Sequence, residues 1–204
     1  MILSHKHRFI FIKTTKTGGT SIEVDLNKIL GDLDIATPIF PVVEGHKPQN
    51  FERGFLKKNF YNHMSASEVR KVVGKDIFHS YFVFCIEREP VDKCISHYSM
   101  LRNSPHHNEK YRNLTFDQYV EKKIFPIDTY KYLDDNRNLL VNRILKYEYL
   151  RDEIEEVAEL LGFKMNFITK AKTGFREDIK VSAAQRDIIY QAFSESLAFT
   201  QYKA

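Results

Sequence analysis

The sequence predicts an α/β protein with a central parallel sheet flanked by helices. Residues 8–13 and 80–87 are runs of apolar, aromatic and β-branched side chains, which is typical of strands that are buried on both faces. A helical pattern follows each run after a short turn, over 20–30 and 90–102. Strand, turn and helix in repeated succession are characteristic of a parallel sheet with helices on both faces.

The composition is that of an ordinary globular domain. Hydrophobic residues make up 43% and charged residues 28% of the 204 residues, which excludes a disordered chain. We find no linker or repeat and expect one domain over 1–204. The formal net charge of +4, without a long Lys/Arg block, argues against a nucleic-acid partner and suits a small polyanionic ligand.

We expect a cytoplasmic protein without a membrane span. No apolar run reaches the ~18 residues of a membrane-spanning helix, and the N-terminal residues lack the pattern of a signal peptide. The two cysteines, Cys85 and Cys94, follow no disulfide or zinc spacing, so we expect both to be buried thiols. No pattern in the chain indicates its oligomeric state.

The remaining elements follow from local patterns. We expect Thr20 or Ser21 to cap the first helix, and residues 31–56, rich in Gly, Pro and Asn, to form a long loop. Ser65 and Glu68 form a capping box at the start of the second helix. The other expected elements are strands at 57–63 and near 144–147, helices at 75–79, 115–123, 149–161 and 182–197, and loops at 103–114, 124–136 and 164–180.

The loop between the first strand and the first helix predicts an anion site. Its glycines and polar residues are Lys16, Thr17, Gly18, Gly19, Thr20 and Ser21. Glycines let the backbone approach an anion closely, while the lysine and the hydroxyls add a charge and further donors. A Walker A loop reads GxxxxGK[ST], whereas here the lysine precedes the glycines. The pattern is therefore P-loop-like without being a Walker A loop.

The segment KTTKTGGTS resembles the 5′-phosphosulfate loop of sulfotransferases that use 3′-phosphoadenosine 5′-phosphosulfate (PAPS). Their second signature follows a central strand, and here it is Arg88, Pro90 and Ser96. The likeness is to bacterial and Golgi-type carbohydrate sulfotransferases. It implies a P-loop-like three-layer fold, in which the arginine and the serine hold the 3′-phosphate of PAPS or of its product PAP. Two departures are Thr15, where proline is usual, and Lys93, where arginine is common.

The resemblance also implies roles in sulfuryl transfer. Lys16 is placed to act on the leaving oxygen and the sulfuryl group, and the reaction needs no metal. A general base is needed for the acceptor hydroxyl, and we favour His63, which matches a histidine-containing turn of the family, over His46 and Glu23. Lys172 and Arg176, in a late basic loop, either bind the cofactor or belong to a solvated surface.

We therefore expect a PAPS-dependent sulfotransferase that acts on a hydroxyl of a small molecule or a glycan. The rival enzyme is a nucleotide or small-molecule kinase, which the missing GK[ST] ending disfavours. The rival from another class is a non-catalytic nucleotide- or glycan-binding module on the same fold. The sequence does not identify the acceptor.

Overall fold

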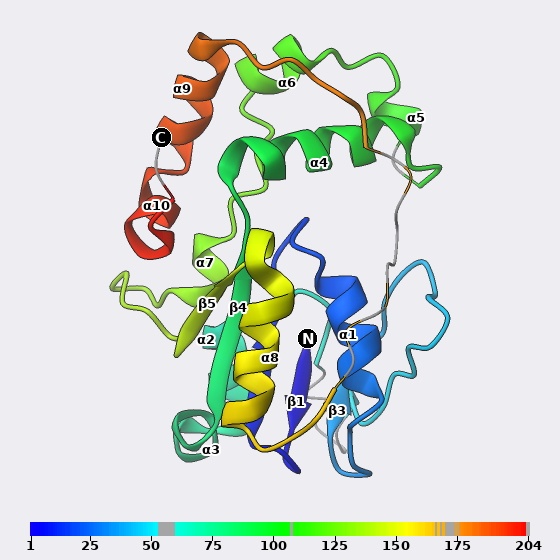
Figure 1. The fold of residues 1–204 in the computed structure, drawn as a ribbon, viewed down its shortest axis with the longest axis vertical. Coiled ribbons are helices and arrows are strands. Elements are labelled where there is room, and N and C mark those ends of the chain that lie inside the picture. The colour runs from blue at the N-terminus through cyan, green and yellow to red at the C-terminus, as the bar shows by residue number, and fades with distance from the viewer. Residues whose placement is uncertain are drawn as a thin grey trace.

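The computed structural model describes residues 1–52, 60–106, 108–165, 167, 169, 174 and 176–202. Within these residues, a five-stranded sheet has the strand order β3-β1-β2-β4-β5 (Figure 1). The strands are β1 (Ile2–Ser4), β2 (Phe9–Ile12), β3 (Ile35–Ala36), β4 (Phe82–Glu87) and β5 (Arg143–Lys146).

The centre of the sheet is parallel and one edge is antiparallel. β2 pairs in parallel with β4, and β4 pairs in parallel with β5. β1 is antiparallel to both β2 and β3, an edge that the sequence did not predict. Only four residues connect β1 to β2, and such a short connection joins antiparallel strands. The α/β class with a flanked central sheet is confirmed.

Most of the expected helices are present. They are α1 (Gly19–Asn27), α2 (Ala66–Val73), α3 (Lys75–Ser80), α4 (Pro90–Asn103), α5 (Asn108–Tyr111), α6 (Phe116–Glu121), α7 (Thr129–Tyr132), α8 (Leu150–Leu160), α9 (Ala183–Ala192) and α10 (Ser194–Thr200). A short 3₁₀ turn, Tyr147–Tyr149, connects β5 to α8. The predicted capping box at Ser65 is confirmed.

Several local expectations are corrected. α5 and α7 lie in segments expected to be loops, β3 lies in the long loop at 31–56, and the C-terminal helix is divided at Phe193. The expected strand at 57–63 lies partly outside the described residues, and residues 60–63 contain a turn instead. These elements are short, and short elements depend more on packing than on a sequence period.

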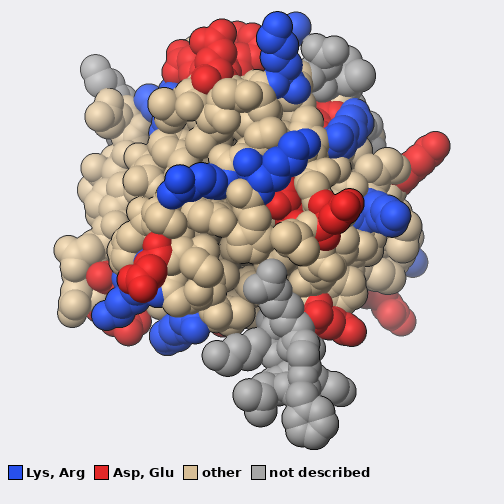
Figure 2. Space-filling view, turned by 90° about the horizontal axis from the view of Figure 1, so that it is seen from below, with Lys and Arg blue, Asp and Glu red and all other residues tan. Residues whose placement is uncertain are grey.

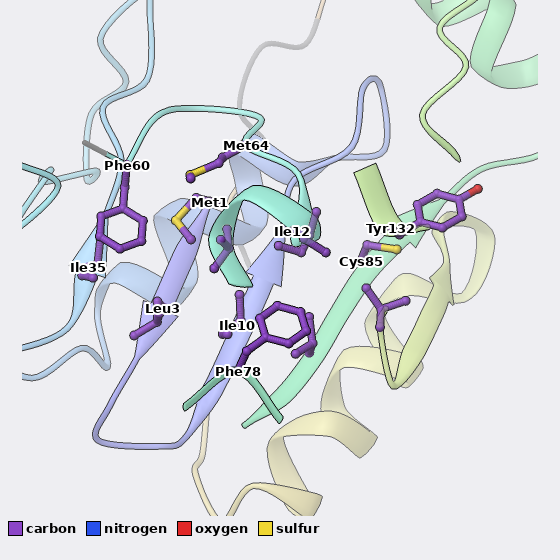
Figure 3. Close-up of a cluster of buried hydrophobic side chains, with 14 of the residues drawn as sticks. Met1, Leu3, Ile10, Ile12, Ile35, Phe60, Met64, Phe78, Cys85 and Tyr132 are labelled. Atoms are coloured by element: carbon purple, nitrogen blue, oxygen red, sulfur yellow. The ribbon is translucent and has the colours of Figure 1, made fainter. Parts of the chain in front are cut away.

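Alternating side chains of β2 build two cores on opposite faces of the sheet. Ile10 and Ile12 pack in one cluster with residues of α2 and α3, and Figure 3 shows part of this cluster, including Phe78 and Cys85. Phe9 and Phe11 pack on the other face, against residues of α1 and α8. The period of two along a strand thus produces three layers, helices, sheet and helices.

A third apolar cluster lies beyond the carboxyl ends of the parallel strands. It joins α4, α6 and α9, which stand above the sheet in Figure 1. Cys94 of α4 is buried here and Cys85 is buried in β4, as expected for core residues. A space between this helical layer and the sheet edge is where ligands bind in such folds. None of the helices in the described part of the chain is long and apolar enough to cross a membrane.

Candidate active site

A cavity of about 760 Å³ lies where β2, β4 and β5 end. The predicted loop residues line it: Lys16, Thr17, Gly18, Gly19, Thr20 and Ser21. The predicted residues His63, Arg88, Ser96 and Arg176 line it as well, whereas Lys172 lies outside the described residues. The volume is in the usual range for small-molecule sites. The structure therefore brings the two sequence motifs to one cavity.

The loop after β2 turns sharply into α1. Lys16 and Gly18 have positive φ angles, 61° and 73°, and Gly18 is the N-cap residue of α1. The helix begins at Gly19, so the expectation that Thr20 or Ser21 caps it is wrong. These two residues lie in the first turn instead, where backbone amides have no intrahelical acceptor and the helix dipole favours an anion.

Side chains of other residues approach Gly18 and Gly19 so closely that neither position leaves normal room for a Cβ atom. A Cβ atom added to Gly19 would lie 2.9 Å from Cγ of Lys13, and one added to Gly18 would lie 3.1 Å from the Tyr147 ring. The loop is thus packed between a lysine stem and an aromatic ring. The backbone of the first turn lies against the cavity, as the predicted anion site requires.

The Thr17 hydroxyl stabilises the loop. Its Oγ1 lies 2.9 Å from Oγ1 of Thr14, and the Thr14 hydroxyl donates to the Ile86 carbonyl of β4. Thr17 is fully buried. Its side chain therefore connects the anion loop to the neighbouring strand, a role that sequence reasoning did not distinguish from ligand binding.

Arg88 is held from three sides at the carboxyl end of β4. Its guanidinium pairs with the Asp92 carboxylate, donates to the Lys16 carbonyl at 3.1 Å, and stands 4.0 Å from the centre of the Tyr147 ring. Arg176 donates to the same Asp92 carboxylate. Two arginines thus converge on one anionic group at the wall of the cavity. Ser96 lies on the same wall, further along α4.

His63 is placed as a hydrogen-bond acceptor toward the cavity that it lines. Its Nδ1 lies 3.1 Å from the Lys13 carbonyl oxygen. A carbonyl only accepts, so Nδ1 carries the proton and Nε2 keeps the lone pair. Burial, and then the Lys131 and Lys13 ammonium groups, lower the pKa of His63 to about 4. The ring is therefore neutral at pH 7, the state that a general base requires.

The two alternative bases are placed differently. Neither Glu23 nor His46 is among the residues that line the cavity. The Glu23 carboxylate is buried and pairs at 2.5 Å with both the Lys13 ammonium and the Met1 amino group. Burial raises the pKa of Glu23, but these two cations outweigh it and lower that pKa overall. His46 is half-buried in the long loop, and burial lowers its pKa.

Sequence reasoning missed a buried charge network beneath the loop. Asp128 pairs with Lys93 at 2.9 Å and with Lys131 at 2.5 Å, and Lys93 also pairs with Glu87 at 2.8 Å. Burial raises the pKa of Asp128, but the two ammonium groups outweigh it and hold this pKa far below its usual range. Burial alone would lower the pKa of Lys93, yet the carboxylates raise it. The network brings together residues from β4, α4 and α7, so no local pattern signals it.

The surface outside the cavity has mixed charge where Figure 2 displays it. A short row of Lys and Arg side chains crosses the middle of that face, with Asp and Glu side chains beside it. The charged residues that line the cavity are mostly basic: Lys13, Lys16, Arg88, Arg151 and Arg176, with Asp25 as the acidic one. Across the described residues, no group of three or more His, Cys, Asp or Glu side chains could hold a metal ion.

No family model matches the chain. The crystal structure of mouse sulfotransferase SULT7A1 complexed with PAP matches 99% of this chain and 69% of that chain, with a TM-score of 0.46 and 14% sequence identity. An uncharacterized protein of Archaeoglobus fulgidus is 33% identical over 103 residues, which are 48% of this chain and 82% of the archaeal one. This chain therefore belongs to the same protein family as that archaeal protein.

Proposed function

We propose that this chain is a PAPS-dependent sulfotransferase that acts as a single domain and transfers a sulfuryl group to an acceptor hydroxyl. One observation carries the proposal: the Lys16 loop and the Arg88 motif, 72 residues apart in sequence, meet at one cavity through the bond from Arg88 to the Lys16 carbonyl. The spacing and order of the two motifs in the sequence give independent support.

The residues present fit the two anionic ends of the donor. The first turn of α1, with Lys16 and the hydroxyls of Thr20 and Ser21, suits the 5′-phosphosulfate. The residues that suit the 3′-phosphate are Arg88, Ser96 and Arg176, because one guanidinium group can donate two parallel hydrogen bonds to a phosphate. Both arginines pair with the Asp92 carboxylate, so their guanidinium groups converge on one oxygen anion.

Each proposed role follows from position. The donor supplies a sulfuryl group on a phosphate leaving group. Lys16 and the α1 amides stabilise negative charge at the bridging oxygen, by analogy with phosphoryl transfer. His63 accepts the proton of the acceptor hydroxyl at Nε2. Phe40 and Met100 also line the cavity and give the acceptor an apolar wall, which suits a sugar ring or a phenol.

Binding and turnover test the proposal separately. Titration calorimetry should show binding of PAP and much weaker binding of ATP with Mg²⁺, since the chain offers a 3′-phosphate site. Transfer of ³⁵S from labelled PAPS to a panel of glycans and phenols should be lost in Lys16→Ala, with an unchanged circular dichroism spectrum. Tighter binding of ATP would favour the kinase alternative. PAP binding without transfer to any acceptor would favour a non-catalytic module, and full turnover in Lys16→Ala would refute the role of Lys16.

A further inference from the structure

Lys131 lies between the anion loop and the histidine, in a position that no sequence motif indicated. Its ammonium nitrogen lies 2.5 Å from Oδ1 of Asp128 and 3.1 Å from Oγ1 of Thr15. The same nitrogen lies 3.5 Å from Nδ1 of His63. The side chain is 3% exposed, so solvent screens these interactions little.

The proton of His63 Nδ1 decides how Lys131 acts on the ring. That nitrogen donates to the Lys13 carbonyl at 3.1 Å, and it therefore has no lone pair for the Lys131 ammonium at 3.5 Å. The Nδ1–H group of His63 and the ammonium group of Lys131 are both donors, so they form no hydrogen bond with each other across the 3.5 Å between them. The Lys131 charge consequently opposes a second proton on the ring, while the Asp128 pair holds the ammonium in place.

We propose that Lys131 is a positioning residue that, anchored by Asp128 and Thr15, keeps His63 neutral with its Nε2 lone pair available to the acceptor hydroxyl. This inference rests on the proposed function for the role of His63 as a base. It goes further by naming the residue that sets the charge state of the base. It also couples the base to the anion loop, because Thr15 both donates to Asp128 and accepts from Lys131.

The other groups that face His63 are consistent with this role. The Lys13 ammonium and the Met1 amino group act in the same direction as Lys131, although more weakly for Met1, and the Lys13 carbonyl opposes them. Lys13 and Met1 both pair with Glu23, whose single negative charge balances only one of them. Lys131 pairs with Asp128, which it shares with Lys93. A polyanion in the cavity would offset these positive charges, so PAP should raise the pKa of His63 toward neutral pH.

Nuclear magnetic resonance of ¹⁵N-labelled histidine rings tests the proposal without an activity assay. The His63 signals are assigned by their loss in His63→Gln. In the wild-type protein at pH about 7, we expect a protonated Nδ1 and an unprotonated Nε2. The titration midpoint of His63 should lie well below the usual ~6.5, and saturating PAP should raise it.

Variants of Lys131 provide the decisive comparison. Lys131→Gln keeps a hydrogen-bond donor for Asp128 but loses the charge, and should raise the His63 midpoint by about one pH unit or more. Lys131→Arg keeps the charge and should leave the midpoint low. Lys75→Gln, at the exposed first residue of α3 at the opposite end of the sheet, is the matched control and should change nothing.

Two results would overturn the proposal. One is an unchanged His63 midpoint in Lys131→Gln. The other, which needs no variant to fold, is a protonated Nε2 in the wild-type protein. If sulfuryl transfer is also measured, the acid limb of its pH profile should move with the midpoint in Lys131→Gln. Absence of transfer in the wild-type protein would refute the proposed function and leave the ring measurements valid.

Discussion

The backbone amide and the hydroxyl of Thr15 both donate to the carboxylate of Asp128, 113 residues away, at 2.7 and 3.0 Å. A proline is usual at this loop position in the sulfotransferases that the sequence resembles, and a proline has no amide hydrogen to donate. In this chain, therefore, a buried carboxylate holds the loop where a rigid ring would otherwise stiffen it. Thr15, which stands where a proline is usual, thus has a specific hydrogen-bond partner in Asp128.

Replacement of Asp128 by alanine should destabilise the protein strongly. The substitution leaves Lys131 without its carboxylate and Lys93 with Glu87 alone, all nearly fully buried. Breaking a buried ion pair in this way costs about 3–5 kcal/mol. Urea unfolding should show this loss, whereas Asp135→Ala, at an exposed position, should stay within about 0.5 kcal/mol of the wild-type protein. A loss of similar size in both variants would contradict the argument.

Arg88→Ala should weaken binding of PAP much more than binding of adenosine 5′-phosphate, which lacks the 3′-phosphate. Hydrogen bonds to charged groups contribute about 1.5–3 kcal/mol, so PAP should lose roughly 10- to 100-fold in affinity by titration calorimetry. Arg137→Ala, whose side chain is 66% exposed, is the control and should bind both nucleotides normally. Equal losses for the two nucleotides in Arg88→Ala would rule out a contact with the 3′-phosphate.

Gly19→Ala should lower both stability and affinity for PAP. The new Cβ would lie 2.9 Å from Cγ of Lys13, whose ammonium is paired with buried Glu23, so the lysine stem has little freedom to move. Overpacking of this kind costs about 1–3 kcal/mol. Gly31→Ala is the matched control, because its Cβ would lie 3.4 Å from the flexible Lys6 side chain. If thermal unfolding and PAP binding are the same in both variants, the close packing of the loop is not required.

Stability should fall as the pH drops from about 6.5 toward 4. Burial lowers the pKa of both His63 and His97 to about 4, with Lys131 and Lys16 respectively as the next causes. The unfolded chain binds these protons near pH 6.5 while the folded chain does not, so folding opposes protonation throughout this window. At pH about 5, each histidine should cost up to about 2 kcal/mol relative to pH 7.

His97→Gln should remove part of this acid sensitivity. Its unfolding free energy, measured by urea denaturation, should fall less between pH about 7 and about 5 than that of the wild-type protein. His79→Gln replaces an exposed histidine and should behave like the wild-type protein. An unchanged pH dependence in His97→Gln would show that His97 titrates normally.

Local patterns in the sequence determined much of this protein. The apolar runs determine β2 and β4, since consecutive buried side chains must contact both faces of a sheet. Glycines beside Lys16 and the proline after Arg88 determine how each strand turns into its helix. Ligands bind where parallel strands end, so the two motifs were expected at one edge, and they line one cavity there.

Only the tertiary structure decided the contacts between distant segments. The tautomer of His63 depends on the Lys13 carbonyl, and the shape of the loop depends on Asp128 of a segment that carries no motif. The short connection makes β1 antiparallel to β2, but only the structure shows that residues 2–4 form a strand and that this strand also pairs with β3. The first helix begins at Gly19 because Gly18, its N-cap residue, adopts a left-handed conformation. The spacing of apolar residues along the sequence indicates how one segment is buried. It does not report which charged partner another segment brings into the same low-dielectric interior, and that partner sets the chemistry of the site.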